Sequence, residues 1–158
     1  VQKSAEDKKS ILSEAENAKE NMLVLAGTAP VEGRGIEVIV NDDKDELSGT
    51  DLAELVNELR AAGADAMAVN GDRIVASTSF RRVDKQMYIG SKKLSKPYVF
   101  KAIGDPDVMV QALTMAGGIR DVLTSSVPGV SFDTKSVERL TVPAAEGAKF
   151  KYSRSVSG

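Results

Sequence analysis

Alternating apolar and polar residues first form a regular pattern after residue 30, where they predict a β-strand. In the segment VEGRGIEVIVND, Ile36, Val38 and Val40 fall on one face of an extended chain. Gly33 and Gly35 precede these residues. In phosphate- and dinucleotide-binding loops the glycines follow a strand and open a helix. We therefore interpret this pair as the start of the strand and not as a phosphate site.

The next apolar residues recur with the spacing of a helix that has one buried side. They occupy positions i, i+3, i+4 and i+7, namely Leu52, Leu55, Val56 and Leu59. We expect Thr50 or Asp51 to cap the N-terminus of this helix and Gly63 to end it. A hairpin follows, because Asn70 and Gly71 form the preferred type I′ turn pair between two runs of strand-forming residues.

Two further short strands are predicted at residues 87–89 and 98–103, with a tight turn at residues 90–91. A second helix begins next. Asp105 is placed to cap it and Pro106 lies in its first turn. Its buried stripe consists of Met109, Ala112, Leu113 and Ala116.

The second helix is expected to end or break at Gly117 and Gly118. A short turn through Leu123 is predicted after this glycine pair. Residues 130–132 and 137–142 then form a terminal pair of strands.

The two ends of the chain have a different texture. Residues 1–27 are rich in Lys, Glu, Ala and Ser and have no Gly or Pro before Gly27, which favours a helix. Its apolar stripe is thin, so we expect either a solvated helical arm or the end of a coiled-coil stalk. Residues 153–158 are expected to form a loose C-terminal tail.

The order of these elements predicts an α+β fold over residues 31–152. We expect a mainly antiparallel sheet with two helices on one face, in a ferredoxin-like arrangement with an inserted hairpin, preceded by the N-terminal helical arm. Such a sheet leaves its other face and its edges free for partners.

Composition excludes much common chemistry. The 158 residues contain no Cys, His or Trp. A typical structural zinc site, a Cys nucleophile, a Ser-His-Asp triad and a His general base are therefore excluded. We expect no catalytic residues, no metal and no cofactor. The net charge of −2 gives no field that would attract nucleic acid, so we expect none as a partner.

An acidic run follows the first predicted strand and consists of Asn41, Asp42, Asp43, Asp45 and Glu46. It lacks the central Gly and the terminal Glu of a calcium-binding loop. Charge runs between periodic segments are usually solvated. We therefore expect a solvated acidic loop.

Basic residues raise the alternative of a small anionic ligand. The candidate ligand-binding residues are Arg34, Arg73, Arg81, Arg82, Lys93 and Lys101. Alternation along strands would scatter several of them over both faces of a sheet. Asp105 or Asp107 is the candidate acid or base of a carboxylate-based hydrolase, although no motif pairs two carboxylates. Asp105 fits the role of a helix cap better.

Several motifs in the same order resemble one protein family over most of residues 31–152. They are GRGIEVIVND, DLAELVNELRAAGADAMAVNGDRI, LSKPYVFKAIGDPDVMVQAL, AGGIRDVL and LTVPAAEG. Together they resemble the domain of unknown function 881 family, also known as YlxW-like proteins. The resemblance implies a single-pass bacterial membrane protein with a coiled-coil-prone segment and this domain on the extracytoplasmic side, sometimes labelled a division initiation protein.

No stretch of these residues approaches the roughly 20 apolar residues of a transmembrane helix, so we expect the anchor in a segment that this sequence does not contain. The family supplies no catalytic residues to carry over. The preferred function is a non-catalytic interaction domain that binds an envelope or division protein, or itself as a homodimer through the N-terminal arm. The alternative is a domain for a small anionic ligand or a carboxylate-based hydrolase.

Overall fold

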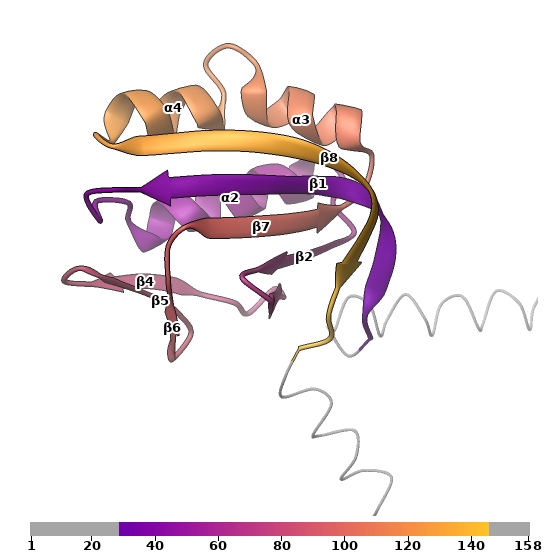
Figure 1. The fold of residues 1–158 in the computed structure, drawn as a ribbon, viewed down its shortest axis with the longest axis horizontal. Helices are drawn as coiled ribbons and strands as arrows, with labels where there is room; N and C mark the ends of the chain where they lie inside the picture. Colours follow the sequence, from indigo (N-terminus) through magenta and orange to yellow (C-terminus); the bar gives the residue numbers. More distant parts are fainter. Residues whose placement is uncertain (1–28, 146–158) are drawn as a thin grey trace, which may run out of the picture.

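The computed structural model describes residues 29–145, which form an α+β domain with mainly antiparallel sheets (Figure 1). The predicted fold class is confirmed. The predicted helical arm, residues 1–27, and the predicted tail, residues 153–158, lie outside the described residues.

The main sheet has five strands in the order β3-β2-β7-β1-β8, and every neighbouring pair is antiparallel. Its strands are β1 (Val31–Asp42), β2 (Ala66–Val69), β3 (Asp72–Ile74), β7 (Tyr98–Ile103) and β8 (Val130–Val142). One helix joins β1 to β2, and two helices join β7 to β8. The ferredoxin-like arrangement with an inserted hairpin stays a prediction.

A second sheet has three antiparallel strands in the order β4-β5-β6. They are β4 (Phe80–Val83), β5 (Gln86–Ile89) and β6 (Lys92–Leu94). Only β5 was predicted as a strand. The chain enters this sheet from the β2–β3 hairpin, where Asn70 and Gly71 both adopt the positive φ that a type I′ turn requires.

Helix α2 (Gly49–Ala61) begins two or three residues earlier than predicted. The cap is Ser48, and neither Thr50 nor Asp51 takes that place. The Ser48 hydroxyl accepts a hydrogen bond from the Asp51 N–H at 3.1 Å, and the Asp51 carboxylate accepts one from the Ser48 N–H at 2.9 Å. Asp51 is thus the third residue of a capping box, in which both side chains satisfy free N–H groups.

Helix α3 (Pro106–Thr114) starts where it was predicted, with Pro106 in its first turn. The prediction of a short turn through Leu123 was wrong. Residues of that segment form helix α4 (Ile119–Ser126), which buries Ile119 and Leu123 against the core.

The helices and the small sheet cover one face of the main sheet and enclose the principal core. Ile36 of β1, Leu55 and Leu59 of α2 and Leu113 of α3 are fully buried there. This confirms that both predicted helices pack on the strand face that carries Ile36. Phe80 of the small sheet stands 6.3 Å from Phe100 of β7, ring centre to ring centre, and extends the same core.

The other face of the main sheet carries a second, smaller apolar cluster. Ala68 of β2 and Ile103 of β7 are buried there in a second cluster with Leu140 and Val142 of β8. The register of β1 with β8 shifts between Gly33 and Gly35, where a Cβ atom on Gly35 would lie 2.0 Å from the Ala102 carbonyl oxygen. The glycine lets the strands approach and bend. β8 is consequently one bent strand, and the predicted terminal pair of strands was wrong.

Candidate interaction surface

Exposed apolar side chains gather on the segment formed by α3 and α4. Among the described residues four large apolar side chains are exposed, and three of them, Val108, Met115 and Val122, belong to this segment. Met115 is 53% exposed and Val122 is 45% exposed. Scattered apolar residues are normal on a protein surface, but a concentration on one element points to a contact site.

The turn between α3 and α4 holds Met115 at the protein surface. Gly117 has a φ of +77°, which favours glycine, and its N–H donates to the Asp121 carboxylate at 2.9 Å. A Cβ atom on Gly118 would lie 2.9 Å from the Met115 carbonyl oxygen. The two glycines that were predicted to end the helix therefore form a compact turn that presents Met115.

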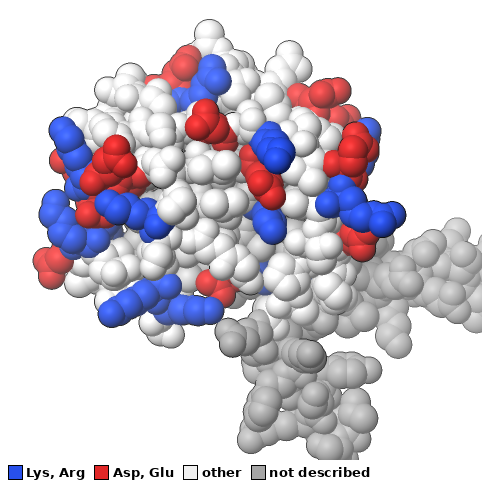
Figure 2. Space-filling view, viewed as in Figure 1, with Lys and Arg blue, Asp and Glu red and all other residues white. Residues whose placement is uncertain are grey.

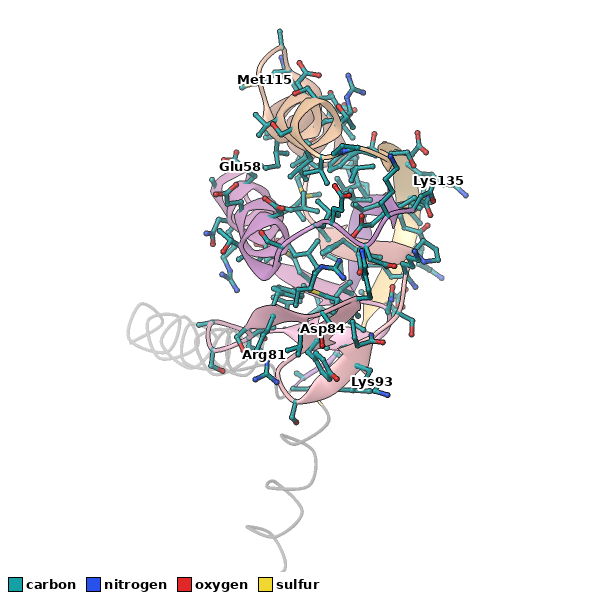
Figure 3. All side chains as sticks on the ribbon, turned by 90° about the vertical axis from the view of Figure 1, so that its left-hand side faces the viewer. Glu58, Arg81, Asp84, Lys93, Met115 and Lys135 are labelled. Atoms are coloured by element: carbon teal, nitrogen blue, oxygen red, sulfur yellow. The ribbon has the colours of Figure 1, made fainter. Side chains whose placement is uncertain are left out.

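A groove of about 360 Å³ lies between α2 and this turn. Its lining residues come from three elements and the turn: Glu54, Glu58, Ala112, Met115, Gly117, Gly118, Ile119 and Val122. Figure 3 shows Glu58 on α2 and Met115 on the turn on the same flank of the molecule, away from Lys135 of β8. The helices thus form a concave surface on the flank of the molecule that lies away from Lys135.

One wall of the groove is acidic. Glu54 and Glu58 are exposed and lie four residues apart on α2, so they are neighbours on the helix surface. No Lys or Arg lines the groove. Within residues 29–145 neither carboxylate takes part in a hydrogen bond or an ion pair. The groove therefore combines an apolar wall with two carboxylates that no cation balances.

The six basic residues proposed to hold a ligand do not converge. Arg81 and Lys93 alone come together: each lies directly across from Tyr88, on β4 and β6 respectively. The Arg81 guanidinium stacks on the Tyr88 ring at 5.4 Å. Figure 3 shows both cations on the small sheet.

Arg34 is exposed at the bend of β1. Lys101 lies on the main sheet opposite Glu37, which faces Lys135 on its other side, so the three form a row of alternating charge. Figure 2 shows acidic and basic side chains interspersed on the face it displays. These placements do not build an anion site.

Arg73 is buried on β3 and has a structural role. Its Nη1 donates to the Ala29 carbonyl at 2.9 Å and to the Pro143 carbonyl at 3.1 Å. These bonds tie the edge of the main sheet to the segment before β1 and the segment after β8. Burial lowers the pKa of Arg73 from its ordinary value.

Arg82 points into the protein and pairs with Asp42, which is 1% exposed. Nη2 of Arg82 lies 2.7 Å from the Asp42 carboxylate, and Nε donates to the Leu47 carbonyl. The Asp42 carboxylate also accepts from the N–H groups of Glu46 and Leu47, each at 3.0 Å. The expectation of a fully solvated acidic run was wrong at Asp42, because the charge is balanced by a residue on another strand.

Two neighbours complete this polar cluster. Lys96 Nζ lies 3.0 Å from the Asp45 carboxylate and donates to the Asp42 and Asp43 carbonyls at 3.1 and 3.2 Å. Tyr98 is buried beside Arg82, and burial raises its pKa, although the hydrogen bond from Arg82 acts in the opposite direction. The cluster joins the small sheet to the main sheet.

The two candidate acids lie at the start of α3. The Asp105 carboxylate accepts hydrogen bonds from the N–H groups of Asp107 at 3.0 Å and Val108 at 3.4 Å, which makes it the N-cap. Both carboxylates are exposed. In the described part of the chain no group of three His, Cys, Asp or Glu side chains is arranged to hold a metal ion.

Reasoning from the sequence missed the groove. Two signals were available in the sequence. Glu54 and Glu58 lie at positions i and i+4 of the first predicted helix, and the apolar residues Met115 and Val122 follow the buried stripe of the second. Their meeting depends on α4, which was predicted as a turn. No helix in residues 29–145 is long and apolar enough to cross a membrane.

Comparison with known proteins gives consistent matches. Residues 18–154 match the family described as "Bacterial protein of unknown function (DUF881)". The chain is 31% identical over 115 residues to the UPF0749 protein YlxW of Bacillus subtilis, covering 66% of this chain and 50% of YlxW. It is 29% identical over 125 residues to the UPF0749 protein Rv1825 of Mycobacterium tuberculosis, covering 77% and 43% of the two chains.

A solved structure shares the fold. The crystal structure of an uncharacterized conserved protein from Mycobacterium tuberculosis superposes with a TM-score of 0.73 at 28% identity, covering 80% of this chain and 90% of that chain. The chain spans half or less of the length of the two curated relatives named above. The likeness therefore concerns this domain and leaves the rest of those proteins uncompared.

Proposed function

The chain belongs to the DUF881 family of bacterial proteins of unknown function, and on that premise we propose that it is a non-catalytic interaction domain. Its partner is an envelope or division protein, or a second copy of the chain. The observation that carries the proposal is the gathering of Met115 and Val122 on a groove beside α2. Burying these exposed side chains against a partner would stabilise a complex.

The arrangement of charged residues supports a binding role over a catalytic one. Asp105 is engaged as a helix cap, and Asp42 is held by Arg82 and two backbone N–H groups. A general acid or base needs a carboxylate that reaches a substrate in a cleft. The groove does contain carboxylates, but Glu54 and Glu58 lie on an exposed helix face beside apolar residues, as at the rim of an interface.

The cellular setting of the proposal comes from the family resemblance. The domain would lie on the extracytoplasmic side of a membrane-anchored bacterial protein linked to cell division or the cell envelope. Residues 1–27 would hold the domain near the membrane and bring two copies together.

A small anionic ligand is the second candidate, and one observation favours it. Arg81 and Lys93 flank Tyr88 on the outer face of the small sheet, so two cations and a ring share one surface. The other four residues of the candidate set, Arg34, Arg73, Arg82 and Lys101, do not share this surface. A titration with inorganic phosphate that shifts the Tyr88 ring signals would favour this candidate, and unchanged signals would reject it.

An affinity capture with the full-length membrane-anchored protein tests the interaction proposal. The double variant Met115→Glu, Val122→Glu places charge on the groove. Val83→Glu is the matched control, because Val83 is 46% exposed on the small sheet. We expect a protein recovered with the unmodified chain and with the control, and lost with the double variant. The same set of proteins recovered with all three would contradict the proposal.

A further inference from the structure

The apolar wall of the groove carries two exposed side chains from neighbouring elements. Met115 follows the last residue of α3 and Val122 lies on α4, and both line the groove. Met115 is unbranched and adaptable, which suits a surface that packs against another side chain. An amphipathic helix places its apolar residues along one stripe and can lay that stripe into an apolar groove.

The acidic wall indicates that the occupant carries positive charge. Glu54 and Glu58 are like charges at positions i and i+4, an arrangement that weakens a helix when no cation lies between them. Such an unfavourable pair, with no compensating contact in the domain, is expected at a functional site. Cations from a partner would remove the repulsion and would also steer the partner toward the groove.

We propose that the groove between α2 and the α3–α4 turn is the docking site for a basic amphipathic helix of a partner protein, an inference that rests on the proposed interaction function. The apolar stripe of the helix contacts Met115 and Val122. Lys or Arg residues along one flank of the helix pair with Glu54 and Glu58.

The chain's own N-terminal stretch fits the groove less well than a basic partner. Residues 1–27 contain four Lys against five Asp and Glu, so the stretch has no cationic excess to match the two carboxylates. A partner with Lys or Arg on one flank supplies the positive charge that the stretch lacks. Charge complementarity therefore favours a different protein over a second copy of this chain.

Designed peptides test the inference on the complete 158-residue chain. The probe is a helical peptide of about 18 residues with Leu at positions i, i+3, i+4 and i+7 and Lys on the flanks. A second peptide carries Glu in place of every Lys. A third has the composition of the probe in scrambled order. Fluorescence anisotropy measures binding, and chemical-shift mapping by NMR locates it.

The expected result is that the Lys peptide binds, shifts the signals of the groove residues and binds more weakly as salt is added. The double variant Glu54→Gln, Glu58→Gln should weaken binding about five- to tenfold, as expected for two ion pairs at the rim. The matched control is Glu46→Gln, Glu138→Gln, which changes charge equally at two exposed positions outside the groove. The control should bind as the unmodified chain does.

Each other outcome overturns the inference in a recognisable way. Equal binding of the Glu peptide, still lost with Met115→Ser, would reject the basic partner and leave the interaction groove in place. Equal weakening by both double variants, or equal binding of the scrambled peptide, would mean unspecific attraction. No binding of any peptide, with dimerisation that Met115→Ser abolishes, would make the groove a contact between two copies. Thermal melting of each variant identifies any loss of fold.

Discussion

The Asp42 carboxylate lies 2.7 Å from Nη2 of Arg82, although 40 residues separate the two in the chain. Asp42 ends β1 of the main sheet, and Arg82 lies on β4 of the small sheet. Asp42 is buried and the Arg82 side chain is 13% exposed. The Leu47 backbone contacts both residues: its N–H donates to Asp42 and its carbonyl accepts from Arg82. The pair therefore fixes the small sheet to the main sheet and has a structural role.

Removing one partner of that pair should destabilise the domain strongly. Asp42→Ala leaves the Arg82 guanidinium buried without its counter-charge, which typically costs about 3–5 kcal/mol. Urea unfolding measures the change in the free energy of unfolding. Asp43→Ala is the control, because Asp43 is exposed and its carboxylate makes no ion pair among the described residues. Equal effects of the two substitutions would contradict the structural role of the pair.

Leu55 tests the packing of α2 on the main sheet. It is fully buried in the principal core, so Leu55→Ala should lower the free energy of unfolding by about 2–5 kcal/mol through lost burial and a residual cavity. Asn57→Ala, at an exposed position of the same helix, should change it little. Unchanged thermal stability of the Leu55 variant would contradict the placement of Leu55 in the principal core.

Gly49 tests the close contact between α2 and the small sheet. A Cβ atom at this position would lie 2.2 Å from the Phe80 carbonyl oxygen, which belongs to the backbone of β4. Gly49→Ala must push the two elements apart and should cost about 1–3 kcal/mol. Thr50→Ala, in the same turn and exposed, is the comparison. A Gly49 variant as stable as the Thr50 variant would show that the contact is loose.

Substitutions at Asp105 distinguish a helix cap from a catalytic acid. Asp105→Asn should be nearly neutral in stability because Asn caps as well as Asp, whereas Asp105→Ala should cost about 1 kcal/mol. Thermal unfolding measures both. We also expect no hydrolase activity of the purified domain that depends on Asp105, and a reproducible turnover lost in Asp105→Asn would support the enzyme alternative.

Local signals in the sequence predicted the elements whose cause is local. The apolar spacing of Leu52 and Leu59 locates α2, the Asn70-Gly71 pair locates the hairpin, and Asp105 with Pro106 locates the start of α3. Ser48 was missed because Asp51 was interpreted as a cap, while it is the reciprocal partner of the cap.

Features that depend on distant residues escaped the sequence. Asp42 resembled a solvated charge because nothing near it in the chain indicates Arg82. β8 looked like two strands, since charged residues such as Lys135 interrupt its apolar pattern on the exposed face and only its pairing with β1 makes it continuous. The groove combines Glu58 with Met115, a contact of three helices that no single segment encodes.

Site-specific photo-crosslinking tests the central claim, that the domain binds a protein through the groove, most directly. A photoreactive amino acid replaces Met115 in the full-length protein inside cells, and a second strain carries it at Val83, whose exposure is similar. We predict a covalent adduct with a protein at position 115 and none at position 83. No protein adduct at position 115, or the same adducts at both positions, would contradict the account.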